Sequence, residues 1–98
     1  MASKWIIVKG EFRIGNVTLH EGLLGMDYQK KERRDEVVGG GLFSYEKIKG
    51  NKKFKLYGAS FDFGSCEVKN FDRIKWPKRF ENDTFYFHDE FGKITKVK

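Results

Sequence analysis

Residues 37–60 read VVGGGLFSYEKIKGNKKFKLYGAS, and this stretch decides the fold. Phe43 and Tyr45 share a face at a spacing of two residues, and apolar and polar side chains alternate again from 53 to 57, the period of a strand with one buried face. The polar segment 49–52 between them holds a Gly-Asn pair, which is typical of a tight turn. We therefore predict that 39–45 and 53–57 are adjacent antiparallel strands.

Further strand patterns lie on both sides of this hairpin. Residues 5–8 (WIIV) are a short apolar run typical of a buried strand. Residues 12–14 and 17–19 alternate on either side of a Gly-Asn pair at 15–16, which predicts two short strands joined by a turn. Residues 84–88 (TFYFH) are aromatic and rich in strand formers. The chain thus predicts a sheet of about six strands.

Two segments carry a helical pattern instead. In 21–34, apolar residues recur three and four positions apart, although two glycines weaken a helix there. In 65–80, apolar residues follow three-residue steps until Pro77, which ends or kinks a helix. The basic segment 93–98 is predicted to be a frayed tail.

Length and composition limit the class of protein. The 98 residues suffice for one domain, so we expect 1–98 to form a single domain. Strands mixed with two helices predict an α/β (α+β) fold, a mixed sheet flanked by two helices. No apolar run approaches the roughly 18 residues of a membrane span, and the first apolar stretch is too short for a signal peptide. We expect a cytoplasmic monomer that makes no membrane contact.

Charge and rare residues narrow the chemistry. The net charge of +6 favours anionic partners, namely phosphorylated substrates, nucleic acid or an acidic protein. The single cysteine, Cys66, excludes an internal disulfide and a cysteine-based zinc site. The two histidines, His20 and His88, show no metal-ligand spacing with carboxylates. We therefore expect no metal and no cofactor.

Glycine placement offers two candidate binding features. Three glycines at 39–41 interrupt a strand pattern, which indicates either a bulge or close packing, or the close approach of a ligand or site side chain. The segment 57–64 (YGASFDFG) runs from a strand into small residues, and its N–H groups can form an anion-binding nest to which Ser60 adds a hydroxyl. An ordinary connecting loop is the alternative for 57–64.

His20 is the candidate catalytic residue. It ends a predicted strand and precedes a predicted helix, where N–H groups of the first turn can hold an anion. Its unperturbed pKa suits proton transfer near neutrality. A half-buried structural histidine is the alternative reading, and we expect that structural role for His88, which lies among aromatic residues.

Together these segments resemble the Janus/Ocnus family of phosphohistidine phosphatases. The resemblance covers roughly residues 4–64 and rests on the strand KWIIV at 4–8, the glycine strand at 39–45 and the YGASFDFG segment. The family's catalytic histidine lies about twenty residues before the glycines, as His20 does here. The last third of the chain matches the family only in the order of its elements.

The resemblance implies a fold, a reaction and site residues. The fold is a mixed sheet with two flanking helices, and the reaction is metal-independent removal of phosphate from phosphorylated His, or from phosphorylated Lys, in proteins. His20 matches the catalytic residue, as general base or as nucleophile. The phosphate-binding positions match Lys4, through its ammonium, and Glu21, Ser60, Phe61 and Asp62, through their backbone N–H groups.

Three positions depart from the family pattern. Small residues usually occupy the positions of Glu21 and Asp62, and an Arg often occupies that of Leu42. A carboxylate that faces the site would repel phosphate. These departures favour an alternative function, a non-enzymatic basic module that binds an anionic protein or single-stranded nucleic acid. A β-rich basic domain can bind single strands by stacking, although no RNA-binding motif occurs here.

Overall fold

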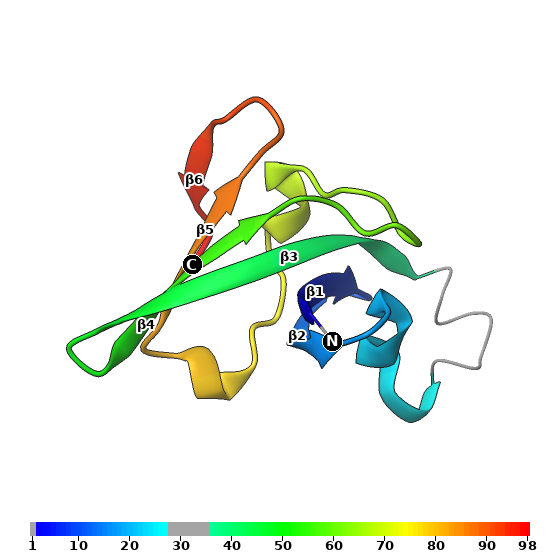
Figure 1. The fold of residues 1–98 in the computed structure, drawn as a ribbon, viewed down its shortest axis with the longest axis horizontal. Coiled ribbons are helices and arrows are strands. Elements are labelled where there is room, and N and C mark those ends of the chain that lie inside the picture. Colours follow the sequence, from blue (N-terminus) through cyan, green and yellow to red (C-terminus); the bar gives the residue numbers. More distant parts are fainter. Residues whose placement is uncertain (1, 28–35) are drawn as a thin grey trace.

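A computed structural model describes residues 2–27 and 36–98 of the chain. Within these residues the secondary structure consists of strands and short 3-10 helices (Figure 1). In chain order the elements are β1 (Ala2–Val8), β2 (Glu11–Val17), η1 (His20–Asp27), β3 (Val37–Ile48), β4 (Asn51–Tyr57), η2 (Val68–Phe71), η3 (Lys78–Phe80), β5 (Thr84–His88) and β6 (Ile94–Lys96).

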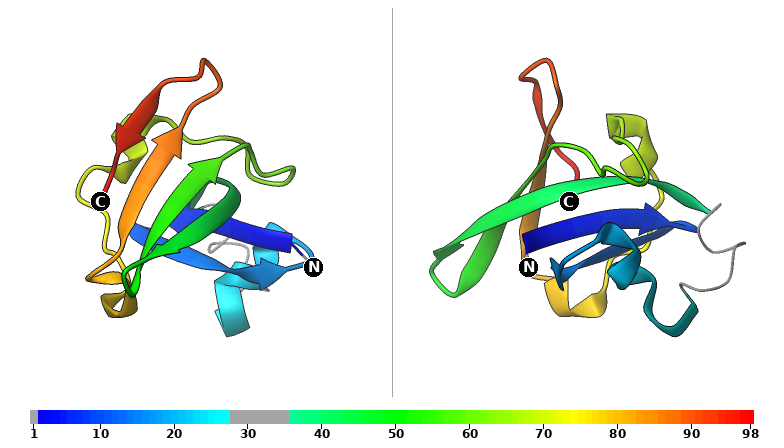
Figure 2. Two further views of the ribbon diagram at one scale, coloured as in Figure 1. Left: turned by 60° about the vertical axis from the view of Figure 1, so that its left-hand side comes forward. Right: turned by 45° about the vertical axis from the view of Figure 1, so that its right-hand side comes forward.

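All six strands belong to one sheet, in the order β2-β1-β3-β4-β5-β6 (Figures 1 and 2). Neighbouring strands are antiparallel except for β4 and β5, which are parallel. A parallel pair requires a long crossover, so residues 58–83 leave the end of β4 and return along the sheet before β5 begins. The prediction of a single domain with a mixed sheet of about six strands is confirmed.

The central hairpin is also confirmed. Strands β3 and β4 pair antiparallel, with Phe43 opposite Leu56 and Tyr45 opposite Phe54. Between the strands, Lys49 and Gly50 have φ angles of 52° and 88°. Positive φ at both central residues is the mark of a type I′ turn, whose twist suits the strands it joins.

The turn predicted at 15–16 is wrong. Strand β2 continues through Gly15 and Asn16, and the chain turns earlier, between β1 and β2. There Lys9 and Gly10 have φ angles of 50° and 74°, again the two-residue type I′ geometry. Gly15 serves packing instead, because a Cβ at this position would lie 3.2 Å from Leu23 Cδ2.

The two flanking helices are not found in the part of the chain that the structure describes. The segment expected to form a helix over 21–34 begins as the 3-10 helix η1, and its positions 28–34 lie outside the described residues. In 65–80, two 3-10 turns replace the helix, and Pro77 precedes the second of them. Short 3-10 turns are the usual outcome where glycine or proline interrupts a weak helical pattern.

The C-terminal segment 93–98 is not a frayed tail. Ile94–Lys96 form the edge strand β6, paired with β5. Beyond it, Val97 N–H donates to Phe85 O at 2.9 Å, and the Lys98 Nζ donates to the main-chain oxygens of Phe80 and Asp83 at 2.6 and 3.0 Å. These bonds fasten the chain end to β5 and η3.

An aromatic core covers one face of the sheet. Trp5 and Phe85 are fully buried there, and Phe54 stacks on Phe85 with ring centroids 4.3 Å apart. From the crossover, Phe71 of η2 and Phe80 of η3 pack onto these rings. The crossover therefore supplies the layer that flanking helices were expected to supply.

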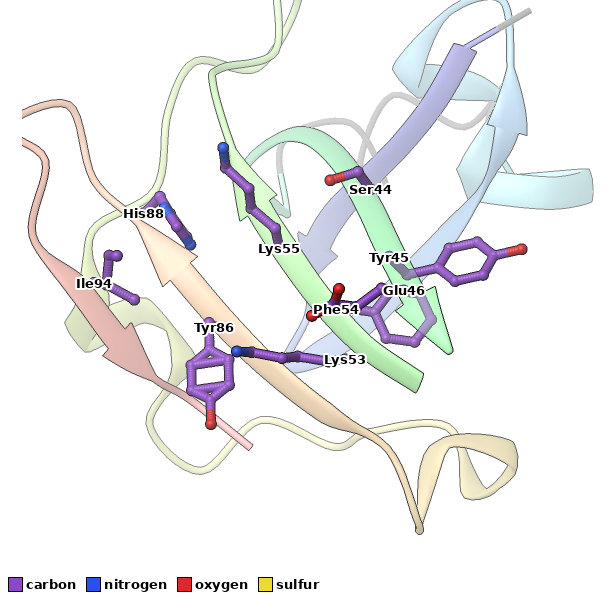
Figure 3. A pocket seen from close by; sticks show the side chains of 9 residues that line it. All are labelled: Ser44, Tyr45, Glu46, Lys53, Phe54, Lys55, Tyr86, His88 and Ile94. Atoms are coloured by element: carbon purple, nitrogen blue, oxygen red, sulfur yellow. The ribbon is translucent and has the colours of Figure 1, made fainter. Parts of the chain in front are cut away.

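The opposite face of the sheet is covered only in part. Ile6 and Val8 of β1 alternate with the core residues and pack against Leu24 of η1. Farther across this face, on β4 and β5, lie Lys53, Lys55 and other polar side chains (Figure 3). The candidate site lies on this second face.

Candidate functional site

The imidazole of His20 packs against the glycines of β3. His20 is the first residue of η1 and is only 4% exposed. Its Nε2 lies 2.8 Å from Gly41 O. A Cβ at Gly40 would lie 3.1 Å from His20 Cδ2, so the absence of a side chain at Gly40 makes room for the ring. The glycines at 39–41 are therefore explained by close packing, and the ring of His20, a candidate site residue, is one of the groups that pack against them.

The hydrogen bond to Gly41 determines which ring nitrogen carries the proton. Gly41 O can only accept, so His20 Nε2 must donate, and in the neutral ring Nδ1 then holds the lone pair. Burial lowers the pKa of His20 below 6.5, and the Lys4 charge lowers it further. The bond to Gly41 and the charge of Asp62 act in the opposite direction without reversing the shift. His20 is therefore a neutral base at neutral pH.

Lys4 and Asp62 lie close enough to His20 for their charges to act on its imidazole. Both charges act on the pKa of the imidazole, although the three residues come from β1, η1 and the loop after β4. The Lys4 Nζ donates to Thr18 O at 2.5 Å, two residues before His20. A cation beside a neutral base is an arrangement suited to an anionic substrate.

The loop 58–64 is closed by its own hydrogen bonds. Ser60 N–H donates to Gly64 O at 3.0 Å, and Gly64 N–H donates to Ser60 O at 2.8 Å. The Phe63 N–H donates to the Ser60 Oγ at 3.1 Å. Ser60 is thus buried and structural here, because its N–H and hydroxyl hold the loop together.

The same loop is tied to the glycine strand. Gly40 N–H donates to Gly64 O at 3.1 Å, next to the residue whose oxygen binds His20. Phe61 and Asp62 lie at the exposed tip, and the side chain of Phe61 is 100% exposed. Of the predicted N–H donors of this loop, those of Phe61 and Asp62 are the ones left for an anion.

Glu21 and Leu42 are the other two positions that depart from the Janus/Ocnus pattern, and they lie in η1 and β3. Glu21 is the second residue of η1 and is half-buried. Leu42 follows the glycines, and its side chain lies against Gly58, where a Cβ would be 3.8 Å from Leu42 Cγ. The Leu42 main-chain oxygen accepts the indole N–H of Trp5 at 2.8 Å. An apolar side chain therefore packs where the family often has Arg.

His88 lies with Lys53 and Lys55 on the outer surface of the sheet, a grouping that the sequence did not predict. His88, expected to be structural, is half-exposed, and its pKa is lowered by partial burial and by the charges of Lys55 and Lys53. The signal was present in the alternation of β5. Phe85 and Phe87 enter the core, so Tyr86 and His88 must face the other way.

The described residues also bear on metal binding and on thiol chemistry. No group of three or more His, Cys, Asp or Glu among residues 2–27 and 36–98 could hold a metal ion. Burial raises the pKa of the Cys66 thiol to about 12, so it stays protonated and is not a nucleophile. In the same ranges, no helix has the length and apolar character to cross a membrane.

Comparison with known proteins finds no family model, no curated protein and no solved structure that matches this chain.

Proposed function

We propose that this chain is a phosphohistidine phosphatase-like hydrolase, which removes phosphate from phosphorylated His or Lys of a cytoplasmic protein without a metal. The observation that carries the proposal is the buried, neutral imidazole of His20, oriented by Gly41 and lying near the Lys4 charge. Phosphoryl transfer depends chiefly on positioning and charge stabilisation, which one base, one cation and a few N–H groups can supply.

The proposed reaction is one displacement at phosphorus. A water oxygen attacks phosphorus while His20 Nδ1 accepts its proton, the P–N bond breaks, and the leaving nitrogen takes a proton in turn. Lys4 and the N–H groups of Phe61 and Asp62 hold the phosphoryl oxygens. At 4% exposure His20 is better placed to contact a small water molecule than to carry a phosphoryl group itself, which favours the general base over the nucleophile.

The pH dependence of turnover tests this assignment. Because the base must be neutral, kcat/KM for phosphate release from a phosphohistidine peptide should fall as pH drops through the pKa of His20, which lies below 6.5. Above that pKa, turnover should stay level through neutral pH. The measurement is initial rate against pH, with the uncatalysed hydrolysis subtracted. A rate that rises toward acid would contradict a neutral base.

Asp62 should weaken phosphate binding. Its carboxylate lies near enough to act on His20, so it also opposes a phosphate placed beside that ring. Asp62→Asn keeps the N–H and removes the charge, and we expect the inhibition constant of inorganic phosphate to fall about fivefold. Glu81→Gln, an exposed change after η3, is the matched control and should leave the constant unchanged. Equal constants in wild type and Asp62→Asn would mean that the carboxylate points away from the site.

A binding module without turnover is the second candidate function. The observation that favours it is the closed loop, in which the N–H of Ser60 is already bonded to Gly64 O. Under this reading the chain binds an anionic protein or single-stranded nucleic acid and releases no phosphate from phosphohistidine peptides at any pH. The same assay therefore separates the two functions.

A further inference from the structure

The outer surface of β3, β4 and β5 presents two lysines, Lys53 and Lys55, with Glu46 opposite Lys53 in the strand register, and we call it the basic face. It borders a hollow of about 520 Å³ (Figure 3). Its side chains are those of Ser44, Glu46, Lys53, Lys55, Tyr86 and His88. Glu46 is the one carboxylate among these six, and none of the ion pairs among the described residues includes Lys53 or Lys55.

Each lysine of the basic face lies over a tyrosine ring. The Lys53 Nζ is 4.9 Å from the ring centroid of Tyr86, and the Lys55 Nζ is 5.1 Å from that of Tyr57. Cation–π contact at these distances holds an ammonium in place while its N–H bonds stay available to an anion. The lysines also occupy the ring faces on which a nucleobase would stack.

The basic face is continuous with the candidate site. Lys4 lies opposite Leu42, and Leu42 lies opposite Tyr57, so the three share one face of adjacent strands. Two strand spacings separate Lys4 from Tyr57, a distance of roughly 10 Å. A peptide held at His20 by its phosphorylated residue can therefore reach Lys55 with a few extended residues.

We propose that the basic face binds an acidic segment of the phosphoprotein substrate, next to the phosphorylated residue in its sequence. Carboxylates of the segment bind the ammonium groups of Lys53 and Lys55 and accept a hydrogen bond from the phenol of Tyr86. Charge complementarity selects an anionic partner, and the covered tyrosine rings favour carboxylates over stacked bases. The assignment of the segment to the substrate rests on the proposed function.

Direct binding of unphosphorylated probes tests the surface without any turnover. The probes are a fluorescein-labelled oligoglutamate peptide, a Gly-Ser repeat peptide and an oligothymidylate, all of equal length, titrated with the whole chain at low salt. We expect oligoglutamate to bind at least about tenfold more tightly than the Gly-Ser peptide. The double variant Lys53→Ala/Lys55→Ala should lose about tenfold in affinity for oligoglutamate. The double variant Lys75→Ala/Lys78→Ala removes the same charge beside η3 and should bind oligoglutamate like wild type.

A second readout reports contact at the basic face itself. Partial burial and the charges of Lys55 and Lys53 lower the pKa of His88. Carboxylates bound to the two lysines should offset their charge and raise this pKa, as measured by NMR titration with and without oligoglutamate. Three results would overturn the proposal: no binding of oligoglutamate by wild type, equal losses in the two double variants, or oligothymidylate binding more tightly than oligoglutamate through Lys53 and Lys55. The last result would identify a nucleic-acid surface.

The failure of this proposal is distinguishable from that of the proposed function. If oligoglutamate binds through Lys53 and Lys55 but phosphohistidine peptides are not hydrolysed, the basic face stands and the phosphatase does not. If hydrolysis occurs, Lys53→Ala/Lys55→Ala should raise KM about tenfold for a phosphohistidine peptide with an acidic flank and leave kcat unchanged. An unchanged KM in that assay would remove the surface alone.

Discussion

Replacing His20 by alanine is expected to lower kcat for phosphate release from a phosphohistidine peptide by about 1,000-fold, within the range found for loss of a general base. The reason is that His20 Nδ1 is the proposed proton acceptor, oriented through the bond from Nε2 to Gly41. Steady-state phosphate release measures the loss. A residual rate should remain, since Lys4 and the loop N–H groups still position the substrate.

His20→Gln separates chemistry from packing. A glutamine side chain can place an amide nitrogen near the position of Nε2 and donate to Gly41 O, but it has no base at the position of Nδ1. We therefore expect near-native stability together with the same loss of kcat. Lys75→Ala, on an exposed residue of the crossover, is the control for turnover. Undiminished turnover in His20→Gln would remove His20 from the mechanism.

Replacing Gly41 by alanine is expected to destabilise the fold by about 3 kcal/mol or more. A Cβ at this position would collide with the main-chain oxygen of Tyr57 and lie 3.0 Å from the Trp5 indole. Strand β3 pairs with β1 on one side and β4 on the other, so the main chain has no free side toward which to move. Urea unfolding followed by tryptophan fluorescence measures the loss.

Gly15→Ala is the matched control for this stability prediction. It makes the same change in β2 at a glycine without positive φ, and its Cβ would meet only the flexible end of the Leu23 side chain at 3.2 Å. We expect a change within about 1 kcal/mol. Similar losses for Gly41→Ala and Gly15→Ala would show that the cost comes from general loss of glycine and not from close approach of strands.

Local patterns predicted the parts of the fold whose cause is local. The β3–β4 hairpin depends on alternation along two segments and on a turn with positive φ at Lys49 and Gly50, all readable in 39–57. The described parts of the predicted helices, 21–27 and 65–80, form 3-10 turns instead, because the helical periodicity there competes with glycines and with Pro77. In the second segment, aromatic packing of Phe71 and Phe80 against the sheet decides the conformation.

The candidate site likewise has some residues that the sequence singled out and some contacts that only the tertiary structure shows. His20 could be singled out because it follows a strand, and the 39–41 glycines could be singled out because glycine rarely interrupts a strand without a reason. Two other features depend on hydrogen bonds and on strand order. The Ser60 N–H donates to Gly64 O, and Lys53 and Lys55 cover tyrosine rings beside His88. No spacing along the chain records those contacts.

The sequence by itself determined a basic single-domain β-rich protein, the central hairpin, and the residues worth testing, because composition, alternation and turn chemistry act between near neighbours. Only the tertiary structure decided the parallel pairing of β4 and β5, which sets Lys55 beside Tyr86. It also decided the burial that, together with the charge of Lys4, keeps His20 neutral against the opposing charge of Asp62. Those properties arise from segments far apart in the chain, whose approach is governed by the burial of the aromatic core.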